Sequence, residues 1–435
     1  MDAEASGGDI SGGDRGGLWF SGDRMGKQPS GRLKACGGAM QRQYPLKFDF
    51  TGEGHISIFG APGTGKTTML QSVVMSLMLH YTPEEVSLYL MDFGGWSLGI
   101  FKDFPHVGGV VYDNDEIRLG KLVQMIERRL FERKEKFSDI GVGSLQAYMQ
   151  ATGEKLPYIV LALDNFAPVL QLYPDLDSFF IQLTREGGNY GIYLVVTANN
   201  PMVLGFKISQ NIKMAVALQM TDKSDYQGIV GKTNGLEPEN TEGRGLAKGN
   251  PPLEFQAALP ARGKSESERV SKIKECAERM RACWKGNCAS PIPVMPEVIP
   301  FGSVHGSGML LGLSAQFVEP LSLPENRKHY MPVVGTGGSG KSNMLLSLAR
   351  QALAEEDAEV VLFTREKCGA GWTGQERCRI LTKTGELDQY MEELVPLLQE
   401  RKKRHEADEG AAFAPIHIFI DDYKKAYEEM GEKTA

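Results

Sequence analysis

Long apolar runs are absent from this 435-residue sequence. None approaches the roughly 18–20 residues of a membrane-spanning helix, and no basic segment followed by an apolar one marks a secretion signal. Cysteine is sparse, with six residues and no C-x-x-C pair, so zinc-site spacing is missing and reduced thiols are expected. A basic excess is also missing, because the net charge is −7. We therefore expect a cytoplasmic globular protein for which nucleic acid is a disfavoured partner.

Composition divides the chain into four parts. Residues 1–40 are rich in Gly, Ser and Asp and are predicted to be disordered. Strand and helix patterns alternate over residues 41–260, which predicts a mostly parallel sheet with helices on both faces. Residues 261–300 are predicted to form a linker of one helix and a proline-rich segment. The same order of elements then begins again over residues 301–435, so we predict two copies of one α/β domain.

The predicted linker helix is locally basic. It begins with a capping-box pattern at Ser265 and Glu268, and apolar residues then recur at helical spacing. A basic face of this kind can contact nucleic acid. The interpretation we favour is a solvated helix that packs one apolar stripe.

Two phosphate-loop patterns are the main chemical signal. Both match G-x-x-x-x-G-K-[ST], and each lies between an expected strand, residues 55–59 or 330–334, and an expected helix. The glycines let successive backbone N–H groups surround phosphates, the lysine adds positive charge, and the Ser or Thr hydroxyl reaches Mg²⁺. The helix N-terminus adds a partial positive charge. The predicted nucleotide-binding residues are Gly60, Gly63, Thr64, Gly65, Lys66, Thr67, Thr68, Gly335, Gly338, Ser339, Gly340, Lys341, Ser342 and Asn343.

Two apolar strand patterns end on aspartate, at Asp164 and at Asp421. A P-loop ATPase needs an acid at the end of a buried strand to organise Mg²⁺, usually beside a second carboxylate that activates water. The predicted metal-binding residues are Thr67 and Asp164 in the first module and Ser342 and Asp421 in the second.

The position after each aspartate differs between the modules. Asn165 cannot accept a proton as a carboxylate does, so the first module is expected to bind nucleotide tightly and hydrolyse it slowly. Asp422 can serve as the base in the second module. The predicted catalytic residues are therefore Asp164, Asp421 and Asp422.

Four further residues have two interpretations each. Thr197 and Asn199 end another apolar strand, where they either hold the attacking water or are ordinary strand-end polar residues. Arg185 and Arg244 are candidates for an arginine finger that reaches a neighbouring subunit's nucleotide. A surface ion pair is the favoured interpretation for both arginines.

Several segments together resemble the FtsK/SpoIIIE family of motor ATPases, in particular its EssC/EccC branch of type VII secretion systems. They are residues 43–46, the first phosphate loop, and residues 89–95, 104–111, 191–199 and 221–226. The resemblance covers roughly residues 41–430. Asp92-Phe93-Gly94-Gly95 stands where the DNA-pumping relatives have D-x-K-G-G, and the missing lysine is typical of the secretion branch.

The resemblance implies RecA-like αβα sandwich domains that use ATP and Mg²⁺ and assemble into hexameric rings. It also implies WXG100-type small helical proteins as substrates, other secretion-machine subunits as partners, and relatives anchored at the cytoplasmic face of the membrane. The family's membrane segment and upstream ATPase domain are not in this sequence. The second module stops shortly after Asp422, before any counterpart of strand 194–197, so we expect a fragment whose second sheet has an exposed edge.

Three functions remain open from the sequence. The leading hypothesis is a motor or regulatory segment of a type VII secretion ATPase. A DNA translocase of the same superfamily would need a basic pore loop, which the acidic composition disfavours. A non-catalytic, nucleotide-gated docking module is supported by Asn165.

Overall fold

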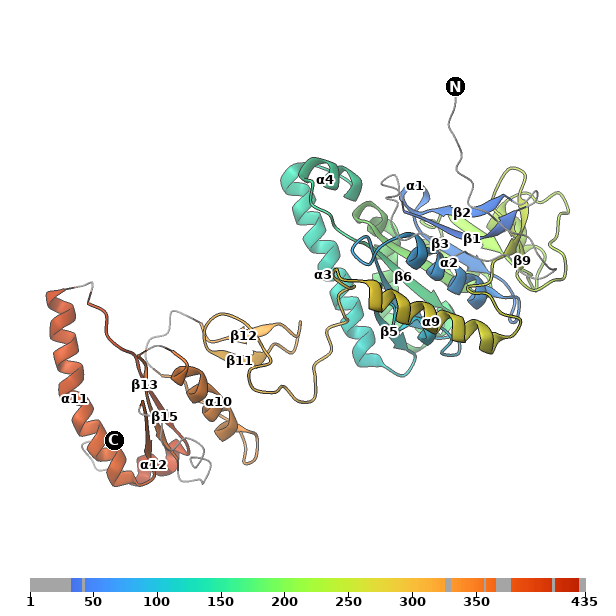
Figure 1. The fold of residues 1–435 in the computed structure, drawn as a ribbon. Coiled ribbons are helices and arrows are strands. Elements are labelled where there is room, and N and C mark those ends of the chain that lie inside the picture. Colours follow the sequence, from blue (N-terminus) through green and yellow to red (C-terminus); the bar gives the residue numbers. More distant parts are fainter. Residues whose placement is uncertain are drawn as a thin grey trace. The chain divides into compact units, whose positions relative to one another are not determined.

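The computed structural model describes residues 33–40, 44–324, 330–355, 357–364, 377–408 and 411–429. They form two compact units, residues 1–294 and 295–435, which are described separately below. None of the helices among these residues is both long and apolar enough to cross a membrane. Figure 1 labels the elements of both units.

The first unit is built on a ten-stranded sheet with the order β2-β1-β10-β9-β8-β3-β7-β6-β4-β5. The six strands from β8 to β5 are parallel, and the other neighbours are antiparallel. This confirms the predicted mostly parallel α/β fold. The strands are β1 (Lys34–Met40), β2 (Pro45–Asp49), β3 (Ile56–Phe59), β4 (Val86–Asp92), β5 (Val107–Tyr112), β6 (Tyr158–Asp164), β7 (Ile192–Ala198), β8 (Met214–Ala217), β9 (Arg244–Ala247) and β10 (Leu253–Ala257).

The helices of the first unit cover both faces of this sheet (Figure 1). The α-helices are α1 (Phe50–Glu53), α2 (Lys66–His80), α3 (Glu116–Ile140), α4 (Leu145–Thr152), α5 (Phe166–Leu172), α6 (Asp177–Glu186), α7 (Gly205–Ser209), α8 (Asp225–Val230) and α9 (Glu266–Cys283). The 3₁₀ helices are η2 (Leu98–Phe101), η3 (Pro174–Leu176), η4 (Gly187–Tyr190) and η5 (Pro201–Leu204).

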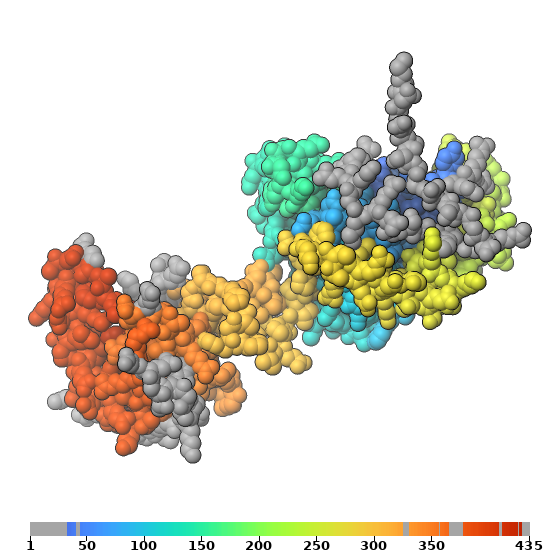
Figure 2. Space-filling view, viewed as in Figure 1, coloured from blue at the N-terminus to red at the C-terminus, as the bar shows by residue number. Residues whose placement is uncertain are grey.

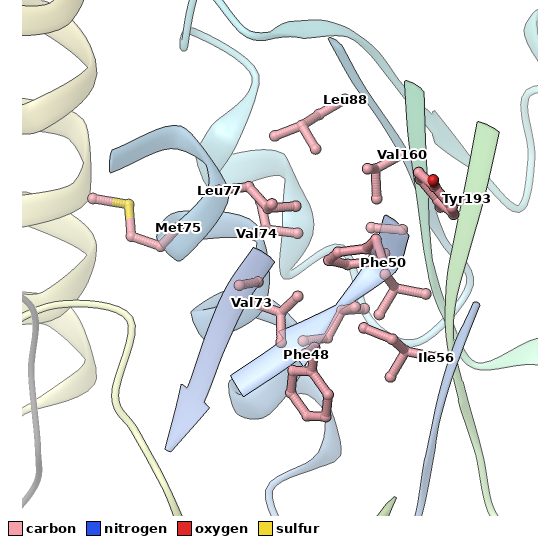
Figure 3. Close-up of a cluster of buried hydrophobic side chains, with 14 of the residues drawn as sticks. Phe48, Phe50, Ile56, Val73, Val74, Met75, Leu77, Leu88, Val160 and Tyr193 are labelled. Carbon is pink, nitrogen blue, oxygen red and sulfur yellow. The ribbon is translucent and has the colours of Figure 1, made fainter. Parts of the chain in front are cut away.

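Alternate side chains of the central strands enter two different cores. On β6, Val160 belongs to the core under α2, and Leu161 to the core under α3, α5 and α6. Every residue of β4, β6 and β7 is buried, which explains why these strands are continuous apolar runs in the sequence. Figure 3 shows the first core, to which Val73 and Leu77 of α2 and Ile56 and Tyr193 of the sheet all belong.

The structure places the predicted linker helix in the first unit. Ile273, Ala277 and Met280 of α9 are buried in the same core as α2, so the favoured apolar-stripe interpretation agrees with the packing. Figure 2 shows α9 lying across the outside of this unit. The chain then follows the edge of β5, where the Ile292 N–H donates to the Gly108 carbonyl at 3.1 Å. The boundary expected at residue 260 therefore moves to residue 294.

The N-terminal segment also differs from the expectation. Lys34–Met40, predicted to be disordered, forms β1 and pairs with β2 and with β10. Its sequence contains two glycines, so local composition resembles a flexible segment. The strand is stabilised by pairing with residues more than 200 positions away in the sequence. Residues 1–32 lie outside the described residues.

The second unit contains two small sheets. One is an antiparallel pair, β11 (Leu310–Leu313) and β12 (Pro320–Ser322). The other is parallel and has the order β14-β13-β15. The remaining elements are β13 (Glu359–Phe363), β14 (Cys378–Leu381), β15 (Ile416–Ile420), α10 (Lys341–Leu353), α11 (Thr384–Ala407) and α12 (Tyr423–Glu429).

One expected strand of the second unit does not form. Residues 330–334, which precede the second phosphate loop, are irregular, and Tyr330 and Val334 are 93% and 90% exposed. In the first unit the corresponding β3 lies between β7 and β8 and bonds to both. Among the described residues of the second unit no strand pairs with this segment, so its backbone groups have no ladder to join.

Candidate nucleotide-binding site

The first phosphate loop connects β3 to α2 at the carboxyl ends of the parallel strands. Gly63 and Gly65 have φ values of 77° and 97°, a region that residues with a Cβ rarely adopt, and Gly65 caps α2. The Gly60 N–H donates to the Ala198 carbonyl, and the Ala61 N–H donates to the Gln219 carbonyl. The loop is thus held by neighbouring strand ends, where open α/β sheets bind their ligands.

Lys66 lies across this loop. Its Nζ donates to the Gly60 carbonyl at 2.7 Å and to the Ala61 carbonyl at 2.9 Å. Burial lowers the pKa of Lys66, and the charge of Asp164 opposes that shift. The ammonium group is therefore near the Asp164 carboxylate and at the centre of the loop, where phosphate-loop lysines contact β- and γ-phosphates.

Thr67, Asp164 and Thr197 form a connected group. The Thr67 Oγ1 donates to Asp164 Oδ2 at 2.8 Å, and the Thr197 Oγ1 donates to Asp164 Oδ1 at 2.7 Å. Asp164 is almost fully buried; desolvation raises its pKa, and the two threonine hydrogen bonds oppose the shift. A hydroxyl and a carboxylate in contact are the hard oxygen ligands that Mg²⁺ prefers, so these residues fit a metal ion.

The predicted sensor residues are placed differently from each other. Thr197 is buried and contacts Asp164, and its Oγ1 also accepts from the Asn165 N–H at 2.7 Å. Asn199 is exposed just beyond the end of β7. The structure thus brings Thr197, and not Asn199, into the hydrogen-bonded group around the Asp164 carboxylate.

A loop that sequence reasoning did not assign to the site lies against Asp164. Asp92 is the register partner of Asp164 on β4, and its buried carboxylate accepts from the N–H groups of Gly94, Trp96 and Leu98. A Cβ added at Gly94 would lie 2.5 Å from Asp164 Oδ2. In the sequence, the segment Asp92-Phe93-Gly94-Gly95 is the signal that could have identified this loop.

Asn165 has a structural role beside the metal carboxylate. It adopts φ 67°, which asparagine tolerates better than most residues, and its Nδ2 donates to the Phe93 carbonyl at 3.4 Å. Asp422 occupies the matching position in the second unit with φ 56°. The two units therefore share this backbone conformation. The residue after the strand-end aspartate is an amide in the first unit and a carboxylate in the second.

Both arginine candidates have partners within the first unit. The Arg185 Nε donates to Glu186 Oε1 at 3.0 Å. Arg244 Nη2 lies 3.4 Å from Glu239 Oε2, and the preceding Gly243 N–H donates to the Thr64 carbonyl. Arg244 is thus beside the first phosphate loop of its own chain.

The second phosphate loop repeats the geometry of the first. Lys341 Nζ donates to the Gly335 carbonyl at 3.0 Å and to the Thr336 carbonyl at 2.8 Å. Gly338 and Gly340 have φ values of 75° and 89°. The Ser342 Oγ donates to Asp421 Oδ1 at 3.0 Å, as Thr67 does to Asp164. Both predicted metal pairs are therefore in contact.

The remaining predicted nucleotide residues lie on the loops or on the first helical turns. The Thr64 Oγ1 donates to the Ala61 carbonyl at 2.8 Å, and the Ser339 N–H donates to the Thr336 carbonyl at 3.3 Å. Thr68 lies in the first turn of α2, and Asn343 is exposed in the first turn of α10.

Known proteins match this chain in sequence and in structure. Residues 25–234 match the FtsK/SpoIIIE family. An EccC protein of the ESX secretion system from Thermomonospora curvata is 31% identical over 335 residues, covering 72% of this chain and 25% of that protein. This chain spans about a quarter of the length of the curated relatives it matches.

Two solved structures match this chain over most of its length and over most of their own. ATPases 2 and 3 of EssC from Geobacillus thermodenitrificans superpose with a TM-score of 0.75 at 22% identity, over 90% of this chain and 84% of that one. ATPases 2 and 3 of T. curvata EccC, solved with a signal sequence peptide, give 0.60 at 26% identity, over 94% and 78%. With the two phosphate loops and their paired acids in place, these matches show that the chain carries an FtsK/SpoIIIE-family domain and is homologous to the type VII secretion ATPases EccC and EssC.

Proposed function

We propose that the chain binds Mg²⁺-ATP at both phosphate loops and acts as a motor or regulatory segment of a type VII secretion ATPase. The observation that carries the proposal is the repeated contact between the loop hydroxyl and the strand-end acid. It joins Thr67 to Asp164 and Ser342 to Asp421 at nearly equal distances. Homology to EccC and EssC supports the ATPase class.

The residues have separate tasks in this proposal. Backbone N–H groups of each loop hold the phosphates, and Lys66 or Lys341 exchanges its carbonyl partners for phosphate oxygens. Thr67 with Asp164, and Ser342 with Asp421, would hold the Mg²⁺ ion. When bound, this ion neutralises charge on the β- and γ-phosphate oxygens. Thr197 keeps the Asp164 carboxylate oriented through its 2.7 Å hydrogen bond.

The two units are proposed to differ in turnover. The Asn165 amide donates to a backbone carbonyl and cannot take a proton from water, so the first unit binds ATP and hydrolyses it slowly. Asp422 gives the second unit a carboxylate at that position. The same observation on Asn165 favours a second candidate function, a nucleotide-gated docking module without turnover of its own.

Substrate and assembly are also proposals. We infer export of WXG100-type small helical proteins, because a homologue of similar architecture was solved with a signal sequence peptide. A homo-hexameric ring, assembled with other secretion-system subunits, would place the arginines of one subunit near the nucleotide of the next.

The direct test is ATP binding and steady-state hydrolysis by the purified chain. We expect Lys66→Ala and Lys341→Ala each to remove one nucleotide site in calorimetric titration, and turnover to fall mainly in Lys341→Ala. Lys155→Ala, an exposed change away from both loops, serves as the control. Binding at both sites without turnover would favour the docking module, and absence of ATP binding would refute the proposal.

A further inference from the structure

A second polar pocket lies in the first unit, at the edge of the sheet opposite the nucleotide site. We call it the α3 pocket. It has a volume of about 230 Å³ and is lined by side chains from the C-terminal half of α3, the first residues of β4 and β6, and Ser290. Ile159 of the lining and Asp164 lie on the same strand, five residues or about 16 Å apart. The pocket and the nucleotide site are therefore separate.

Three cationic side chains line the α3 pocket. Arg129, Arg133 and Lys136 recur at helical spacing along one face of α3. Glu132 also lines the pocket, but its carboxylate is shared between Arg129, at 3.2 Å, and Arg128, at 2.8 Å. The lining therefore carries three positive charges and one negative charge, and Lys136 is also paired at 2.9 Å with Glu154, which lies outside the lining.

Arg133 is the buried member of this group. It is 5% exposed, and its guanidinium donates to two backbone carbonyls, those of Tyr190 and Pro157. Among the ion pairs of the described residues none includes Arg133. A guanidinium has five N–H donors, so donors remain after these two bonds. Burial, with a smaller contribution from the charge of nearby Arg129, lowers the pKa of Arg133 to about 10.

We propose that the α3 pocket binds an oxyanion of the phosphate class through Arg129, Arg133 and Lys136. A buried cation without a counter-ion is costly, and a bound anion offsets that cost. Three cationic side chains match the several acceptor oxygens of a phosphate group better than the two of a carboxylate. Tyr89 also lines the pocket, and its hydroxyl donates to the Ser290 carbonyl at 2.8 Å. This inference is independent of the proposed ATPase function.

The test is phosphate binding by the full chain in a Lys66→Ala, Lys341→Ala background, which removes the lysines of both phosphate loops. Isothermal titration with inorganic phosphate is expected to show a site that Arg129→Gln weakens at least about fivefold. Arg128→Gln is a matched control, because Arg128 neighbours Arg129 and shares its Glu132 partner but does not line the pocket. It is expected to change affinity less than about twofold.

One more variant and one more ligand test the direction of the charge effect. Glu132→Gln removes the negative charge of the lining and is expected to tighten phosphate binding. Acetate is expected to bind more weakly than phosphate, and a preference for acetate would contradict the phosphate class. Absence of a phosphate heat, or equal loss in Arg128→Gln and Arg129→Gln, would overturn the proposal. Arg129 is 47% exposed in its side chain, so the variant is expected to keep the wild-type melting temperature.

Discussion

The two units contain the same kind of phosphate loop but differ in the segment that precedes it. In the first, the phosphate loop leaves β3, which bonds to a strand on each side within a parallel region of six strands. In the second, the segment before the loop is exposed and irregular, and the described parallel sheet has three strands. The lysine and hydroxyl contacts are nevertheless nearly equal. The geometry of each phosphate loop therefore follows from residues close in sequence. The strand before the loop forms only where strands distant in sequence pair with it.

The largest expected difference between the units is in core stability. Phe180 is fully buried among the helices and strands of the second core of the first unit, so Phe180→Ala should cost about 3–5 kcal/mol of unfolding free energy. Denaturant unfolding followed by hydrogen exchange would show the loss in residues 44–294. Phe206→Ala, at a phenylalanine that is 79% exposed, is the control. A comparable loss in residues 295–429 would contradict two independent units.

The second largest effect is expected on acidification, which should lower the unfolding free energy of the first unit. Burial lowers the pKa of both His55 and His106 in the first unit to about 4, and the hydrogen bonds of these rings to the backbone of Thr184 and Tyr81 oppose the shift. The unfolded chain therefore binds more protons between about pH 6.5 and pH 4, and stability present above this window is lost as the pH falls. We expect roughly 2 kcal/mol per histidine by pH 5. An unfolding free energy for residues 44–294 that stays constant from pH 7 to pH 5 would refute this.

The smallest effect concerns the loop that supports Asp164. A methyl group at Gly94 would meet the metal carboxylate, so Gly94→Ala should weaken Mg²⁺-dependent nucleotide binding at the first site roughly tenfold. Gly143→Ala places its Cβ in open space and provides the control. Calorimetric titration with and without Mg²⁺ measures the effect. Equal affinities in the two variants would show that Asp164 does not need its present position.

Sequence reasoning predicted the α/β fold class and the position of both phosphate loops better than the bounds of individual elements. The phosphate loops, Asp164 and Asp421 were predictable, because a glycine pattern or a strand ending in an acid is a local signal. Thr197 was found as a strand-end residue, although its contact with Asp164 depends on the pairing of β6 with β7. The position of Gly94 beside Asp164 could not be predicted, because it follows from the register between β4 and β6.

The errors in architecture have a common physical cause. Lys34–Met40 is a strand because β2 and β10 pair with it, and α9 belongs to the first unit because its stripe meets the core under α2. Residues 330–334 have an apolar strand pattern, but no described strand pairs with them. In each case contacts between distant residues decided the outcome, and composition within a short window could not reveal them.

The segment along β5 has a mechanical consequence. The Ala289 N–H donates to the Pro105 carbonyl and the Ile292 N–H to the Gly108 carbonyl, just before the chain leaves the first unit at residue 294. A pulling force transmitted along the backbone from residue 295 would load these two hydrogen bonds before any strand of the ten-stranded sheet. These two hydrogen bonds would break first and release the segment from the edge of β5, while the phosphate loop at the other end of the parallel strands stays intact.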